Sequence, residues 1–145
     1  MLVDTHCHIH EPNYGLAIDD VLKQARKSGV KKMICVGTSG DSSLAAVEFS
    51  KRRKGVFATI GVHPHDAKDG VDTVQHILSS GVPKKVVGIG EIGLDYFYTY
   101  SPRDDQIKAF EVQLALAAKH GLPVSFHVRD AFDDFWSILD NFKGI

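Results

Sequence analysis

LVDTHCH, at residues 2–8, is the stretch that indicates most clearly how this chain folds. It begins with apolar and β-branched residues, which favour a strand, and it ends with two histidines. Because side chains alternate between the two faces of a strand, Asp4, His6 and His8 share one face. Two imidazoles on one face, two residues apart, can bind the same metal ion. We therefore predict a first strand that carries part of a metal site, provided that later strands end in a similar way.

The remainder of the chain alternates strand-like and helix-like stretches. Apolar runs predict further strands at residues 32–37, 56–63, 86–91 and 124–129. Amphipathic stretches predict helices at about 18–28, 41–53, 74–81, 101–120 and 132–139. The helix at 101–120 should begin at Ser101 and turn four apolar residues inward: Ile107, Phe110, Leu114 and Ala118. Five strand–helix units predict an α/β fold with a parallel sheet and right-handed connections, in a single domain over residues 1–145.

The composition limits the classes of partner. The 145 residues are 43% hydrophobic, which is enough for one core, and the formal net charge is -1. This charge gives no basic surface for nucleic acid or an anionic membrane, although bound divalent cations would supply positive charge for a phosphorylated substrate. No apolar run is long enough to span a membrane and no signal-peptide pattern precedes the first strand, so we expect a cytoplasmic protein. Cys7 and Cys35 are expected to be buried free thiols.

Polar residues occupy the carboxyl ends of the predicted strands. They are His6, His8, His63, Glu91, His127 and Arg129. In a βα-barrel this edge of the strands carries the functional site. The nitrogen and oxygen ligands among them suit zinc, manganese or similar ions: His6, His8, Glu91 and His127. A carboxylate between histidines can bridge two ions ~3.5–4 Å apart, as in the hydrolysis of phosphate esters. The alternative is that each residue only satisfies its own local hydrogen bonds.

Four motifs contain these residues, namely DTHCH at 4–8, GVHPH at 61–65, GIGEIGLDY at 88–96 and HVRDA at 127–131. Together they resemble the TatD family of metal-dependent deoxyribonucleases, and the resemblance covers nearly the whole chain. It implies a TIM-barrel (βα)8 hydrolase that cleaves DNA phosphodiester bonds with two divalent metal ions, Mg, Mn or Zn.

The resemblance also implies roles for individual residues. The two histidines of the first strand would hold one ion, Glu91 would bridge both ions, and His127 would hold the second. His63 and Arg129 match motif positions close to the metals, so we expect both to contact the substrate phosphate. DNA or another phosphodiester is the implied partner, and no membrane or protein partner is inferred. The aromatic residues of the next loop should either stack on nucleobases or pack beneath the following helix: Tyr96, Phe97, Tyr98 and Tyr100.

The number of βα units departs from the family. A family member has eight, and its later strands bring a further metal-binding histidine and an aspartate that handles the attacking water, so the catalytic residue is expected beyond the end of this chain. We expect a fragment of a longer protein, and a shortened product of a frameshift or split gene is the alternative. Alone, the chain should be aggregated, self-associated or only loosely folded and should lack appreciable nuclease activity, because a partial barrel exposes inward apolar side chains. Those expected to be exposed include Met33, Phe57, Val87 and Ile89.

Two other functions remain open. Another barrel amidohydrolase, which cleaves C–N or lactone bonds, would also place two histidines on its first strand. Several such enzymes have a bridging lysine where this chain has Glu91, which favours the phosphodiesterase. A non-catalytic metal-binding fragment is the other alternative, and a turnover assay would distinguish it from both enzymes.

Overall fold

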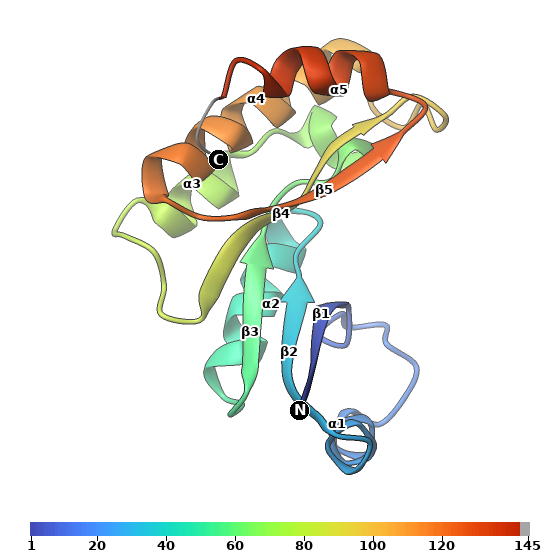
Figure 1. Ribbon diagram of the computed structural model, residues 1–145, viewed down its shortest axis with the longest axis vertical. Helices are drawn as coiled ribbons and strands as arrows, with labels where there is room; N and C mark the ends of the chain where they lie inside the picture. Colours follow the sequence, from blue (N-terminus) through green and yellow to red (C-terminus); the bar gives the residue numbers. More distant parts are fainter. Residues whose placement is uncertain (143–145) are drawn as a thin grey trace.

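The computed structural model describes residues 1–142 and contains one parallel sheet with helices packed against it (Figure 1). The strands are β1 (Leu2–Cys7), β2 (Val30–Val36), β3 (Val56–Ile60), β4 (Val86–Asp95) and β5 (Val124–Arg129). The helices are α1 (Ile18–Lys27), α2 (Gly40–Lys51), the 3-10 helix η1 (Pro64–Asp69), α3 (Asp72–Leu78), α4 (Arg103–His120) and α5 (Phe132–Leu139). The strand order β1-β2-β3-β4-β5 follows the chain, and each neighbouring pair is parallel. The predicted α/β fold with five βα units is confirmed as a half-barrel.

Strands β3 and β4 end at positions that differ from the prediction. The strand predicted to reach His63 ends at Ile60, and the chain leaves the sheet before η1 begins at Pro64. In contrast, β4 continues beyond Glu91 to Asp95, because β5 pairs with this extension along its length. Asp95 therefore reaches the same edge of the sheet as the last residues of β5.

The helix predicted to begin at Ser101 begins at Arg103 instead. The Ser101 hydroxyl donates a hydrogen bond to the carbonyl of His65 (2.7 Å) and accepts one from the amide of Lys68 (3.1 Å). It therefore ties η1 to the start of α4 and does not cap the helix. The helix ends as predicted at Gly121, whose φ of 62° is a left-handed conformation that glycine adopts readily.

The core lies between the sheet and the helices that cover it. Of the four α4 residues predicted to face inward, Phe110 and Leu114 are fully buried, Ile107 is half-buried and Ala118 is exposed. Two glutamines of the same helix are buried instead. The buried face of α4 is therefore rotated relative to the face predicted from its apolar residues.

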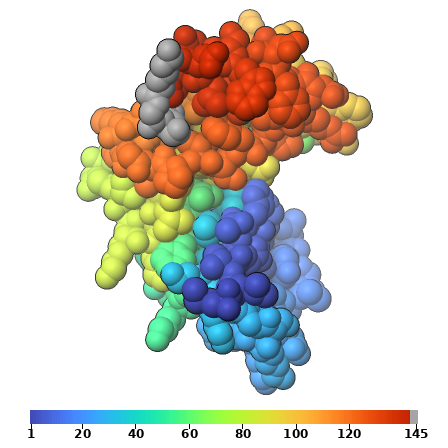
Figure 2. Space-filling view, in the orientation of Figure 1, coloured from blue at the N-terminus to red at the C-terminus, as the bar shows by residue number. Residues whose placement is uncertain are grey.

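The exposed apolar residues differ from those predicted for an open barrel. Met33 and Ile89 are only 8% and 0% exposed, because both join the hydrophobic core, and Phe57 and Val87 are half-buried. The first two residues of β1, an edge strand of the sheet, are instead 58% and 45% exposed. In Figure 2 the start of the chain, in dark blue, lies open at the surface.

Two further sequence predictions concern the membrane and the thiols. No helix within residues 1–142 is long and apolar enough to cross a membrane. Both cysteines are free, as predicted: Cys35 is buried, and the half-buried Cys7 donates a hydrogen bond from Sγ to the carbonyl of Ile34 (3.3 Å).

Candidate metal centre

Glu91 of β4 lies between histidines that come from the two edge strands of the half-barrel. Its Oε2 atom is 3.4 Å from Nε2 of His6 on β1, and its Oε1 atom is 3.3 Å from Nδ1 of His127 on β5. His8 follows β1, and the ligand atoms of His6, His8 and Glu91 all lie within 4.8 Å of one another. The structure brings the four predicted ligands to one place, and their role as metal ligands stays a prediction.

His8 is oriented by a hydrogen bond to the backbone. Its Nδ1 atom is 3.0 Å from the carbonyl oxygen of Val36. A carbonyl only accepts hydrogen bonds, so the proton of the neutral ring is assigned to Nδ1 and the lone pair to Nε2. Histidines that bind metals are commonly fixed by such a second hydrogen bond. The donor set and its orientation therefore fit a divalent cation.

The electrostatics of Glu91 also suit a cation. The hydrogen bond with His127 holds the pKa of Glu91 below its usual range, although partial burial acts in the opposite direction. The same hydrogen bond raises the pKa of His127. Glu91 is therefore a carboxylate at neutral pH, and its two oxygens face two different histidines. A carboxylate in this position can bridge two metal ions.

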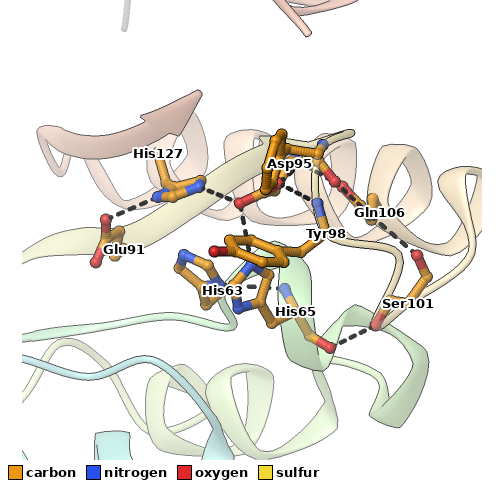
Figure 3. A network of polar contacts seen from close by, with 9 residues as sticks. His63, His65, Glu91, Asp95, Tyr98, Ser101, Gln106 and His127 are labelled. Atoms are coloured by element: carbon orange, nitrogen blue, oxygen red, sulfur yellow. Dashed lines mark hydrogen bonds and ion pairs between the residues drawn. The ribbon is translucent and has the colours of Figure 1, made fainter. Parts of the chain in front are cut away.

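A second group of polar side chains adjoins His127 and is shown in Figure 3. The ring centroid of His63 is 4.3 Å from that of His65 and 4.2 Å from that of His127. Asp95 is fully buried, and its Oδ2 atom accepts hydrogen bonds from Nε2 of His65 (3.0 Å) and Nε2 of His127 (2.8 Å). Asp95 is not among the site residues predicted from the sequence, although its even spacing from Glu91 on one strand is a signal that both share a face.

His63 has a low affinity for protons in this position. Burial lowers its pKa to about 4, with help from His127 and His65, so the ring is neutral near pH 7. Its Nδ1 atom accepts the backbone amide of His65 (3.1 Å), which assigns the ring proton to Nε2. A neutral His63 can donate a hydrogen bond to a phosphate but brings no positive charge to it.

Arg129 lies over the aromatic loop that follows β4. Its guanidinium carbon is 4.0 Å from the ring centroid of Phe97 and 4.8 Å from that of Tyr98. The rings of Tyr98 and Tyr100 are stacked at 5.4 Å with 12° between their planes. Tyr96 packs inward and donates a hydrogen bond to an aspartate of α5 (2.7 Å), whereas Phe97 and Tyr100 are 55% and 58% exposed. Tyr96 therefore packs against the protein, whereas the exposed rings of Phe97 and Tyr100 remain open to stack on nucleobases.

Two buried glutamines of α4 hold the backbone at this edge of the sheet. Gln113 accepts a hydrogen bond from the amide of Val62 (2.7 Å) and donates one to its carbonyl (3.1 Å). Gln106 makes the same pair of hydrogen bonds with Asp95, at 2.8 and 3.0 Å. Each glutamine therefore pairs with the backbone N–H and C=O of one residue, as a neighbouring strand would. Through these contacts α4 positions the segment that carries His63 and the end of β4.

An open cavity of about 500 Å³ adjoins His8 on the side of α2. Its lining includes Glu11, Asn13 and Ser42 beside apolar Pro12 and Ala45, and contains no lysine or arginine. His10 lies behind this lining, where its Nε2 is 3.1 Å from the Ser42 hydroxyl, and Ser42 donates to Glu11 (2.5 Å). His10 is thus fixed in a separate hydrogen-bonded group.

The chain matches a known family over nearly all of its length. The family model described as TatD related DNase matches residues 3–144. The sequence is 36% identical over 140 residues to the uncharacterized metal-dependent hydrolase YabD of Bacillus subtilis, which covers 96% of this chain and 55% of that protein. It is 41% identical over 123 residues to the 3'-5' ssDNA/RNA exonuclease TatD of Cronobacter sakazakii, which covers 84% of this chain and 47% of that protein.

A solved structure has the same architecture. YJJV, a TatD homolog from Escherichia coli, matches with a TM-score of 0.87 at 29% sequence identity, over 97% of this chain and 55% of that chain. The chain therefore spans about half the length of the curated relatives that it matches. The matched region contains every residue described at this edge of the sheet.

Proposed function

The chain belongs to the TatD related DNase family, and we propose on this basis that its protein is a metal-dependent nuclease that hydrolyses DNA phosphodiester bonds at a two-metal centre. The observation that carries the proposal is the position of Glu91 between His6 of one edge strand and His127 of the other. The Cronobacter sakazakii relative is named for single-stranded DNA and RNA, so both are substrates to test. The cytoplasmic localisation expected from the sequence belongs to this proposal, and cell fractionation tests it.

The proposed ligands divide between two ions of Mg, Mn or Zn. His6 and His8 would hold one ion, Glu91 would bridge both, and His127 would hold the second through Nδ1. When bound, the two ions would supply positive charge to the phosphodiester and lower the pKa of a water molecule to about 7. The ionised Glu91 and the free Nε2 lone pair of His8 are ready for this role without rearrangement.

The surroundings of the centre supply contacts for a nucleic acid. His63 would donate a hydrogen bond from Nε2 to a phosphate oxygen. Beside it, Tyr98, Tyr100 and Phe97 present aromatic rings on which bases can stack, and Arg129 adds a positive charge over two of them. Stacking of this kind tolerates any base, so we expect little sequence preference.

Replacement of Glu91 by glutamine tests the proposal directly. Glu91→Gln keeps the size of the side chain but removes the charge that a bridging ligand needs. The control is Glu48→Gln, since Glu48 is an exposed residue of α2 that pairs with Lys51 (2.5 Å). Metal content is measured by mass spectrometry, and cleavage is measured on single-stranded DNA and RNA oligonucleotides with Mg²⁺ or Mn²⁺.

In the longer protein expected from the sequence, we expect the wild type and Glu48→Gln to hold two ions per chain and to cleave the oligonucleotide. Glu91→Gln should lose both properties. Two ions retained in Glu91→Gln would show that Glu91 does not bridge. Metal binding without any turnover would instead favour the non-catalytic alternative, and turnover of amide or lactone substrates alone would favour an amidohydrolase.

A further inference from the structure

The Asp95 carboxylate is shared between the aromatic loop and the candidate metal centre. Its Oδ1 atom accepts hydrogen bonds from the backbone amides of Phe97 (3.1 Å) and Tyr98 (2.9 Å). Its Oδ2 atom accepts hydrogen bonds from Nε2 of His65 (3.0 Å) and Nε2 of His127 (2.8 Å). Figure 3 shows Asp95 between the loop and the two imidazoles. Four N–H groups therefore point at one buried carboxylate, which has about four lone-pair positions to receive them.

This arrangement determines which nitrogen of His127 carries a proton. A carboxylate only accepts hydrogen bonds, so Nε2 of His127 must be the N–H donor to Asp95. When the ring is protonated, Nδ1 donates the hydrogen bond to Oε1 of Glu91 (3.3 Å); in the neutral ring the lone pair on Nδ1 faces that oxygen instead. A lone pair and a carboxylate oxygen that face each other repel unless a cation lies between them.

We propose that Asp95 is a positioning residue that holds His127 in the tautomer protonated on Nε2, so that the Nδ1 lone pair is directed at the ion shared with Glu91. The identity of that ion rests on the proposed function, whereas the tautomer does not. A carboxylate behind a metal-binding histidine fixes both the orientation of the ring and its tautomer, and its loss typically costs 10–100-fold in metal affinity.

A competing explanation is that His63, His65 and His127 form a metal site of their own, since their ligand atoms also lie within 4.8 Å of one another. The hydrogen bonds argue against it. Nδ1 of His63 accepts the amide of His65, and Nε2 of both His65 and His127 is directed at Asp95. One nitrogen of each ring is therefore engaged, and the other nitrogen of His63 carries the proton, so the trio cannot offer three lone pairs to one ion without breaking these hydrogen bonds. The trio instead supports His127.

Asparagine at position 95 is the sharpest perturbation. If its oxygen receives the two loop amides, its NH₂ group faces the imidazoles and cannot accept from them. If its oxygen faces the imidazoles, its NH₂ group opposes the loop amides. The matched control is Asp134→Asn, because Asp134 is a carboxylate of α5 that binds Tyr96 and Arg103 and makes no hydrogen bond to His127.

The primary measurement is the ¹⁵N chemical shift of both ring nitrogens of His127 in the intact, metal-free protein, recorded at a pH above the raised pKa of His127 so that the ring is neutral. The wild-type protein and Asp134→Asn should show protonation on Nε2, and Asp95→Asn should shift toward Nδ1. Titration with Mn²⁺ or Zn²⁺ should give an affinity about 10–100-fold lower for Asp95→Asn.

Wild-type His127 protonated on Nδ1 would overturn the proposal even if Asp95→Asn does not fold. So would an unchanged tautomer in Asp95→Asn, or an equal change in Asp134→Asn. If the wild-type protein binds no metal but the tautomer of His127 still changes between the wild type and Asp95→Asn, the proposed function is wrong and the role of Asp95 is supported.

Discussion

Replacement of Gln113 by methionine tests whether α4 holds the strand ends at the candidate centre. Methionine has nearly the length and volume of glutamine, so it fills the same buried space, but it cannot donate a hydrogen bond. The change leaves the amide and the carbonyl of Val62 without their partners. Each buried backbone group left unsatisfied costs about 1–3 kcal/mol. We therefore expect Gln113→Met to lower the free energy of unfolding by about 2–6 kcal/mol.

A third hydrogen bond of the Gln113 side chain adds little to this figure. It is made to the carbonyl of Ala109, which the helix already pairs with the backbone amide of Gln113. Urea unfolding of the intact protein, followed by circular dichroism, measures the change in free energy if the m-value is constant. The control is Gln75→Met on α3, an exposed glutamine whose replacement should alter stability by less than about 0.5 kcal/mol.

Hydrogen exchange locates the effect within the protein. The amide of Val62 should exchange with solvent much faster in Gln113→Met, because its acceptor is the Gln113 side chain and not a strand. If the free energy of unfolding of Gln113→Met lies within about 0.5 kcal/mol of the wild-type value and the amide of Val62 still exchanges slowly, Gln113 is not the partner that the backbone of Val62 needs.

Three further predictions concern the edge of the sheet and its loop. Gly93→Ala should abolish metal binding, because a Cβ at this φ of +146° would collide with the backbone oxygen of His127, whereas a Cβ on Gly15 meets no atom of residues 1–142 within 4 Å, so Gly15→Ala should bind metal normally in the same titration. Burial and a hydrogen bond to a carboxylate raise the pKa of Tyr96 to about 12, above the value of ~10 for an unfolded chain. The contribution of Tyr96 to the stability of the fold should therefore be complete below pH ~10 and lost as the pH rises toward 12. Phenolate absorbance of the wild type, compared with that of Tyr96→Phe, checks this. Tyr100→Ala should weaken the binding of single-stranded oligonucleotides by about 1–3 kcal/mol, the usual value of one stacked base, in a fluorescence anisotropy titration, and unchanged binding would exclude the loop as a stacking surface.

The order of the elements was predictable because strands and helices have different periods of apolar residues. The same reasoning placed His6 near the carboxyl end of its strand, whereas β4 continues to Asp95, beyond the end predicted at Glu91. The end of β3 was not predictable in this way. Apolar residues continue through Val62, but the strand stops at Ile60 because the backbone of Val62 bonds to the Gln113 side chain.

The buried polar residues were beyond the reach of periodicity. A glutamine at an inward position conflicts with an apolar helix face, so the pattern favours Ala118 over Gln106 or Gln113. Their partners are backbone groups 11 and 51 residues away in the sequence, and no local pattern marks such contacts. Asp95 was within a recognised motif, yet its role depends on which nitrogens surround its carboxylate, and this requires coordinates.

The distance in sequence between Val62 and Gln113 has a consequence for the order in which the protein is made. Gln113 is added to the growing chain 51 residues after Val62. At a synthesis rate of about 5–20 residues per second, this is a delay of roughly 3–10 s. During that interval the Gln113 side chain is absent, so the amide and the carbonyl of Val62 lack the partners that hold them in the folded protein. The segment that carries His63 is therefore fixed only when α4 docks on the sheet, and not when β3 emerges.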